Sequence, residues 1–92
     1  MTIRWTPPAF DDLESLHAYI SVENASTADA TVDQVLAGIE ALGRHPEMGR
    51  TGRVAGTREL VVPPFVVAYK VRHGAVEIIA IIHGARRWPD SF

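Results

Sequence analysis

Cationic, histidine and aromatic side chains gather in the second half of the chain, where they could bind phosphate and move protons. A strongly aliphatic segment runs directly into HGARRWP, residues 83–89. Arginines neutralise phosphates, a histidine transfers protons near neutral pH, and a tryptophan stacks on a nucleic-acid base. A metal-free ribonuclease needs little more than these groups. The candidates are Arg50, Arg53, Arg58, Lys70, Arg72, His83, Arg86, Arg87 and Trp88.

Three ring-bearing side chains also have plain structural explanations. Trp88 could fold back as a cap over helices, with Pro89 as the chain stop, instead of contacting a target. His83 could be a hydrogen-bonded histidine at a strand end. Tyr69 alternates with two valines, so we expect it in the core with its hydroxyl at the edge.

The sequence lacks the residue patterns for a metal site, a phosphate-binding loop or a serine or cysteine nucleophile. The four histidines lie on four separate segments with no metal-ligand spacing, and the chain has no cysteine. Gly49, Gly52 and Gly56 precede a strand, whereas a phosphate-binding loop precedes a helix. No serine stands in a nucleophile elbow. We therefore predict neither a metal site nor a cofactor.

The charge of the chain is divided between its halves. Residues 1–43 hold one basic and seven acidic residues, for a net charge of −6, whereas residues 44–92 hold eight basic and four acidic residues, for +4. A basic surface built by the second half would suit nucleic acid or an acidic protein. The same division would also arise if the charges served only solubility.

Length and composition bound the architecture. A chain of 92 residues with 47% hydrophobic residues is expected to form one folded domain over residues 1–92. The N-terminal segment lacks the apolar run of a secretory signal, and no segment is long and apolar enough for a membrane span. We therefore expect the protein in the cytoplasm.

The first half is predicted to hold a short strand and two helices. Residues 2–5 suit a strand, and Thr6 as N-cap with a following proline predicts a helix over 7–22. Ser26 and Asp29 resemble a capping box that opens a second amphipathic helix, which Gly43 ends. With so short a connection, the helices should form an antiparallel hairpin.

The second half is predicted to hold a loop and three strands. Residues 43–56 contain four glycines and a proline and should form the loop. The segments TRELVV, FVVAYKV and VEIIAIIH, rich in β-branched residues, predict three antiparallel strands. Residues 76–83, apolar on both faces except for a glutamate, should be the central strand. The predicted class is α+β, in the order β-α-α-β-β-β, with the helix hairpin on a small, mostly antiparallel sheet.

Taken in order, these segments resemble the RelE/ParE superfamily of bacterial type II toxins. The similarity covers nearly the whole chain. Its most specific parts are HPEMGR after the second helix, TREL at the next strand, V-x-Y-K-V, and the terminal I-x-H-G-x-R-x-W. Each motif alone is weak, and their order and spacing carry the resemblance.

The resemblance implies a toxin that halts growth when free and is neutralised by a cognate antitoxin. RelE-like members are metal-free endonucleases that cut mRNA on the ribosome, and ParE-like members bind and poison DNA gyrase. The nuclease alternative would use Arg58, His83 and Arg86, and the other cations and Trp88 would bind the target. Where the RelE group carries a catalytic arginine this chain has Val66, which favours the ParE-like gyrase binder.

The antitoxin implied by the resemblance would be encoded beside the toxin and would form a hetero-oligomer with it. A small domain with a basic sheet should gain stability from such a partner. We expect an acidic amphipathic helix or strand of the antitoxin to lie across the sheet.

Overall fold

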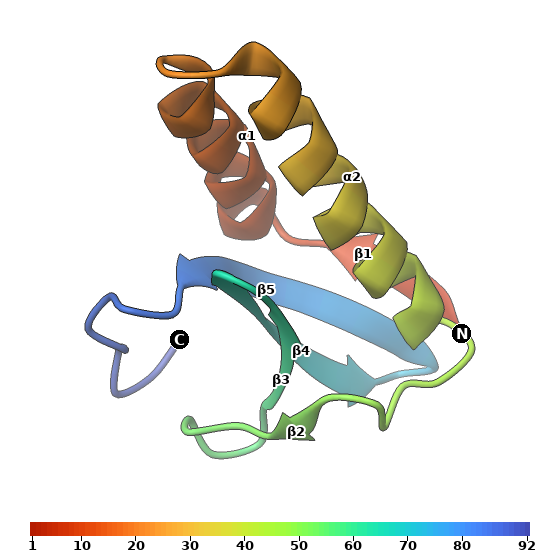
Figure 1. The fold of residues 1–92 in the computed structure, drawn as a ribbon. Helices are drawn as coiled ribbons and strands as arrows, with labels where there is room; N and C mark the ends of the chain where they lie inside the picture. Colours follow the sequence, from red (N-terminus) through yellow and green to blue (C-terminus); the bar gives the residue numbers. More distant parts are fainter.

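Two helices cover one face of a five-stranded sheet (Figure 1). The computed structural model describes all 92 residues. In chain order the elements are β1 (Thr2–Trp5), α1 (Pro7–Ser21), α2 (Ala25–Leu42), β2 (Arg50–Thr51), β3 (Arg58–Val62), β4 (Phe65–Arg72) and β5 (Ala75–His83). The predicted α+β class and helix hairpin are confirmed.

The strands lie in the order β1-β5-β4-β3-β2. β1 runs parallel to β5, and every other neighbouring pair is antiparallel. The two-residue strand β2 was not predicted; it forms within the expected loop because Arg50 and Thr51 pair with Glu59 and Arg58. This extra edge strand makes β4 the middle strand, so the prediction that residues 76–83 are central was wrong, although β5 is an interior strand.

Helix α1 begins as predicted. The Thr6 side chain accepts a hydrogen bond from the Ala9 N–H, and prolines occupy the first helical positions, where no N–H is needed. The same Thr6 hydroxyl donates to the carbonyl oxygen of Ile78 at 2.8 Å, which ties the start of the helix to β5. α1 ends at Ser21, within one residue of the prediction.

Helix α2 begins earlier than predicted. Its N-cap is Asn24, whose side-chain oxygen accepts a hydrogen bond from the Thr27 N–H at 3.0 Å. Ser26, the predicted cap, lies inside the first helical turn. Asn24 has the extended backbone that an N-cap requires, and its amide oxygen satisfies one of the free N–H groups of the first turn.

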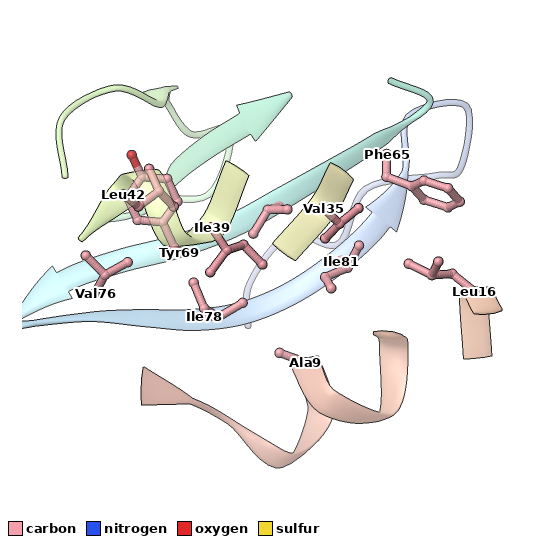
Figure 2. Close-up of a cluster of buried hydrophobic side chains, with 11 residues drawn as sticks. Ala9, Leu16, Val35, Ile39, Leu42, Phe65, Tyr69, Val76, Ile78 and Ile81 are labelled. Carbon is pink, nitrogen blue, oxygen red and sulfur yellow. The ribbon is translucent and has the colours of Figure 1, made fainter. Parts of the chain in front are cut away.

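The core lies between the helices and the sheet (Figure 2). Its largest fully buried members are Tyr69, Leu42, Ile78, Val35 and Val67. Burying an aliphatic side chain of this size contributes roughly 1.5–3 kcal/mol, so this layer dominates the stability of the fold. Neither helix combines the length and the apolar character that crossing a membrane requires.

A bulge in β5 shapes one end of the molecule. Tyr69 pairs with Ile78 and Ala68 with Ala80, which leaves Ile79 without a partner on β4. β1 has ended by this point, and the Ile81 N–H donates instead to the Asp12 carboxylate on α1 at 2.9 Å. This bond ties α1 to the end of β5 just beyond the bulge.

Candidate functional site

The loop after α2 is held by the buried hydroxyl of Tyr69. This hydroxyl donates to the carbonyl oxygen of Pro46 at 2.8 Å and accepts from the Gly49 N–H at 2.9 Å. Tyr69 lies in the core, as predicted, but its hydroxyl is enclosed by the loop and does not lie at the edge; burial raises the pKa of this hydroxyl. A Cβ on Gly49 would lie 2.5 Å from the hydroxyl oxygen, which explains the glycine in HPEMGR.

Arg58 serves the same loop. It lies opposite Tyr69 on β3, and its guanidinium group donates to the carbonyl oxygens of Gly49 at 2.8 Å and Glu47 at 3.4 Å. Arg58, which the sequence placed in the nuclease trio, therefore already donates to two carbonyl oxygens of the protein.

The sheet face opposite the helices carries a buried carboxylate, Glu59, which is 1% exposed. It accepts hydrogen bonds from the Arg50 guanidinium at 2.9 Å, the Arg53 backbone N–H at 2.7 Å and the Arg53 guanidinium at 3.2 Å. Burial raises the pKa of Glu59, but the hydrogen bonds from Arg53 and Arg50 outweigh it, so the pKa lies below its ordinary value. Two predicted target-binding arginines are thus paired within the protein.

A second carboxylate on this face pairs two more arginines. Glu77 on β5 accepts from Arg4 at 3.1 Å and forms an ion pair with Arg72 at 2.9 Å. Lys70 lies across the strands from Glu77 without forming an ion pair. The prediction of an open basic sheet therefore needs correction, because three of its arginines, Arg50, Arg53 and Arg72, are paired with these two glutamates. Sequence reasoning missed both glutamates, although alternation in TREL and VEII already placed each on the face opposite the core.

The C-terminal segment covers part of the same face (Figure 1). Trp88 packs against Ala68, Ala80 and Ile82, and the guanidinium carbon of Arg53 lies 3.8 Å from the centroid of its ring. The alternative in which Trp88 folds back is correct in kind, but the indole covers the sheet and not the helices. Its contacts with the sheet leave it only partly exposed.

His83 and Arg86 share a groove of about 890 Å³. The groove lies between the helix hairpin and the meeting ends of β4 and β5, with Leu16, Phe65 and Ile81 among its apolar lining residues. His83 Nδ1 accepts a hydrogen bond from the Ala85 N–H at 3.1 Å, as expected of a histidine at a strand end. The Arg86 N–H donates to the His83 carbonyl oxygen at 2.9 Å, which closes a turn between them.

The structure does not bring Arg58 to these two residues. In the strand register Arg58 lies opposite Tyr69, and His83 lies opposite Phe65. Phe65 and Tyr69 are four residues apart on β4. At the rise of a β-strand this separation is ~13 Å along the strand, and β4 stands between the two. The trio therefore divides into a pair, His83 and Arg86, and a distant loop anchor. Arg87, predicted as a target contact, is exposed beside Arg86.

Comparison with a protein-family model identifies the chain over most of its length. Residues 3–88 match the model of the ParE toxin of the parDE type II toxin–antitoxin system. The match includes the loop that Tyr69 holds, both carboxylates and Trp88.

Individual relatives agree with this match. A putative toxin, Y4kP of Sinorhizobium fredii, is 35% identical over 90 residues, which is 96% of this chain and 93% of the relative. Toxin RelE2 of Caulobacter vibrioides is 33% identical over 82 residues, which is 89% of this chain and 93% of the relative. A solved chain from the chromosomal ParDE system of P. aeruginosa shares the fold, with a TM-score of 0.81 and 24% identity over 90% of this chain and 95% of its own.

Proposed function

Because the chain belongs to the ParE toxin family of type II toxin–antitoxin systems, we propose that the free protein halts growth by binding and poisoning DNA gyrase. The observation that carries this proposal is the separation of the nuclease trio. Arg58 is bonded to the loop after α2, far from His83 and Arg86. Val66, in the position where the RelE group carries an arginine, is 4% exposed and supplies no charge.

The hydrogen bond to His83 also supports binding over cleavage. Because Nδ1 accepts the Ala85 N–H, the neutral ring carries its proton on Nε2. In that form Nε2 donates a hydrogen bond and has no lone pair to accept the proton of an attacking hydroxyl. His83 is thus prepared to contact a target but not to act as a general base.

Of the lysine and arginine residues predicted to contact a target, three remain available for a negatively charged surface of that target. Arg86 and Arg87 are exposed beside the groove, and Lys70 lies on the open sheet face without an ion pair. Charges at such an exposed rim mainly steer association and fix orientation. We assign to Arg86 and Arg87 the contact with gyrase.

The antitoxin is the second partner in this proposal. An acidic amphipathic segment of the antitoxin would meet the cations that the two glutamates leave uncompensated, and the pair would form a hetero-oligomer. Antitoxin and gyrase would both be met in the cytoplasm, where we place the protein. We treat residues 1–92 as one toxin domain.

A second candidate function is ribosome-dependent cleavage of mRNA, with Arg58, His83 and Arg86 as the trio. The observation in its favour is that His83 and Arg86 line the same groove. In addition, one relative at 33% identity carries the name RelE2. This function would require Arg58 to leave its loop acceptors or another cation to replace it.

Two assays on the purified toxin separate these functions. With gyrase and plasmid DNA, we expect loss of supercoiling and accumulation of cleaved DNA, both weakened in an Arg86→Ala/Arg87→Ala double variant. Primer extension on an mRNA under translation should show no new ends. Unchanged supercoiling together with new mRNA ends that His83→Ala abolishes would reject gyrase poisoning in favour of the nuclease.

A further inference from the structure

The last six residues of the chain are held by side-chain packing without hydrogen bonds. Residues 87–92 make no hydrogen bond, either through the backbone or through side chains. The last polar tie of the C-terminal segment is the turn in which the Arg86 N–H donates to His83. Beyond it, Trp88 packs on the sheet, and Phe92 meets Trp88 edge-on at 6.4 Å between ring centroids. Trp88 is therefore the anchor of this segment.

The indole of Trp88 lies between an apolar floor and a cation. The floor is Ala68, Ala80 and Ile82, two small side chains and one larger one that leave room for a flat ring. The Arg53 guanidinium stacks on the ring with 3.8 Å between its central carbon and the ring centroid. The indole N–H is buried without an acceptor, so packing and this cation–π contact hold the ring without help from a hydrogen bond.

Arg53 owes its position to Glu59. The Glu59 carboxylate receives both the backbone N–H and the guanidinium group of Arg53, which fixes the residue at both ends. Glu59 is itself rigid, because it is 1% exposed on a strand paired on both sides. Arg50 binds the same carboxylate from β2, but the stacked cation on Trp88 is Arg53.

We propose that Glu59 and Arg53 are positioning residues that clamp Trp88 and thereby hold the C-terminal segment, residues 84–92, in the arrangement that presents Arg86 and Arg87. Neither positioning residue contacts the target. The docked segment is a property of the free toxin. Its consequence for activity rests on the proposed binding of gyrase.

The clamp is tested with a matched pair of arginine variants. Arg53→Ala and Arg50→Ala each remove one arginine from Glu59, but only the first removes the cation from Trp88. In a Trp5→Phe background Trp88 is the only tryptophan, and Arg53→Ala should shift its emission to the red, whereas Arg50→Ala should not. Trypsin cleavage after Arg86 and Arg87 should become about tenfold faster in Arg53→Ala, the change expected from losing a cation–π contact of about 1.4 kcal/mol.

Glu59→Gln is the more specific test, because the side chain keeps its shape and loses only the charge that holds Arg53. It should free Trp88 as Arg53→Ala does, by releasing Arg53. Equal effects of Arg50→Ala and Arg53→Ala, or no effect of Glu59→Gln, would overturn the clamp. The proteolysis measurement uses the natural sequence, so a folding defect caused by Trp5→Phe does not prevent the test.

Toxicity and gyrase inhibition are then measured for Arg53→Ala. If Trp88 is freed and inhibition falls, the positioning role stands. If Trp88 is freed and inhibition persists, the role in presenting Arg86 and Arg87 is overturned. If the natural toxin leaves gyrase unaffected, the proposed function fails, and emission and proteolysis still decide whether the clamp exists.

Discussion

The hydroxyl of Tyr69 and the backbone N–H of Gly49, twenty residues apart, are joined by a 2.9 Å hydrogen bond in the interior. The same hydroxyl donates to Pro46, so one side chain from the middle strand holds the loop that follows α2. Two motifs that carry the family resemblance, HPEMGR and V-x-Y-K-V, thus meet in space. Their shared role is structural, because they fix the loop that leads into the segment carrying Arg50 and Arg53.

Tyr69→Phe should therefore destabilise the protein. The substitution removes the donor to Pro46 and the acceptor for Gly49 while it keeps the ring in the core, and leaving buried polar groups unpaired costs about 1–3 kcal/mol. Urea denaturation measures the change in the free energy of unfolding. Tyr19→Phe, at a side chain that is 81% exposed, is the matched control and should leave that free energy unchanged. Equal stability of both variants would contradict the role of the hydroxyl.

The N-cap of α2 can be tested directly, because the structure assigns it to Asn24 and the sequence pattern assigned it to Ser26. Asn24→Ala removes the side-chain acceptor of the Thr27 N–H and should lower the free energy of unfolding by about 1 kcal/mol. Ser26→Ala should change it by less than about 0.5 kcal/mol, because Ser26 lies within the helix and is exposed. Thermal denaturation of both variants measures the difference. The reverse ranking would restore Ser26 as the cap.

Acid should remove the contribution of Glu59 to stability. The pKa of Glu59 lies below its ordinary value in the folded protein, so its stabilisation is complete above the unfolded pKa of about 4.3 and is lost as the pH falls through the folded pKa. Glu59→Gln should be less stable than the natural protein at pH 7, and the gap should narrow below about pH 4. Urea midpoints across this range measure it. Glu23→Gln, at an exposed turn, is the control, and a gap independent of pH would argue against the ion pair.

Antitoxin binding should raise the melting temperature of the toxin. A partner that binds only the folded state, present at 100 times its dissociation constant, stabilises that state by about 2.7 kcal/mol. For a domain of this size such a gain shifts the melting temperature by roughly 10 °C or more. Differential scanning fluorimetry with and without purified antitoxin measures the shift. An unchanged melting temperature at that excess would show that the antitoxin does not stabilise the fold.

The elements of the fold were predictable because each depends on neighbours in the chain. Apolar spacing and the Thr6 cap place α1 to within one residue, and β-branched runs locate the three longer strands. The cap of α2 was misplaced because Asn24 and Ser26 both suit an N-cap, and only the extended backbone of Asn24 decides between them. β2 escaped prediction because a strand of two residues forms only where a partner, here β3, is already present.

The features of the candidate site likewise divide into those that the sequence predicts and those that only the fold decides. The sequence alone determined the family, the helix hairpin on a sheet, the core position of Tyr69 and the concentration of cations in the second half. Only the tertiary structure decided which cations are free, because ion pairs join residues far apart in the chain. Glu59 and Glu77 occupy four arginines, Arg58 binds the loop, and Arg53 reaches a tryptophan thirty-five positions later. A count of charges reports their number and sign, whereas their availability depends on the partner that the fold places within 4 Å of each.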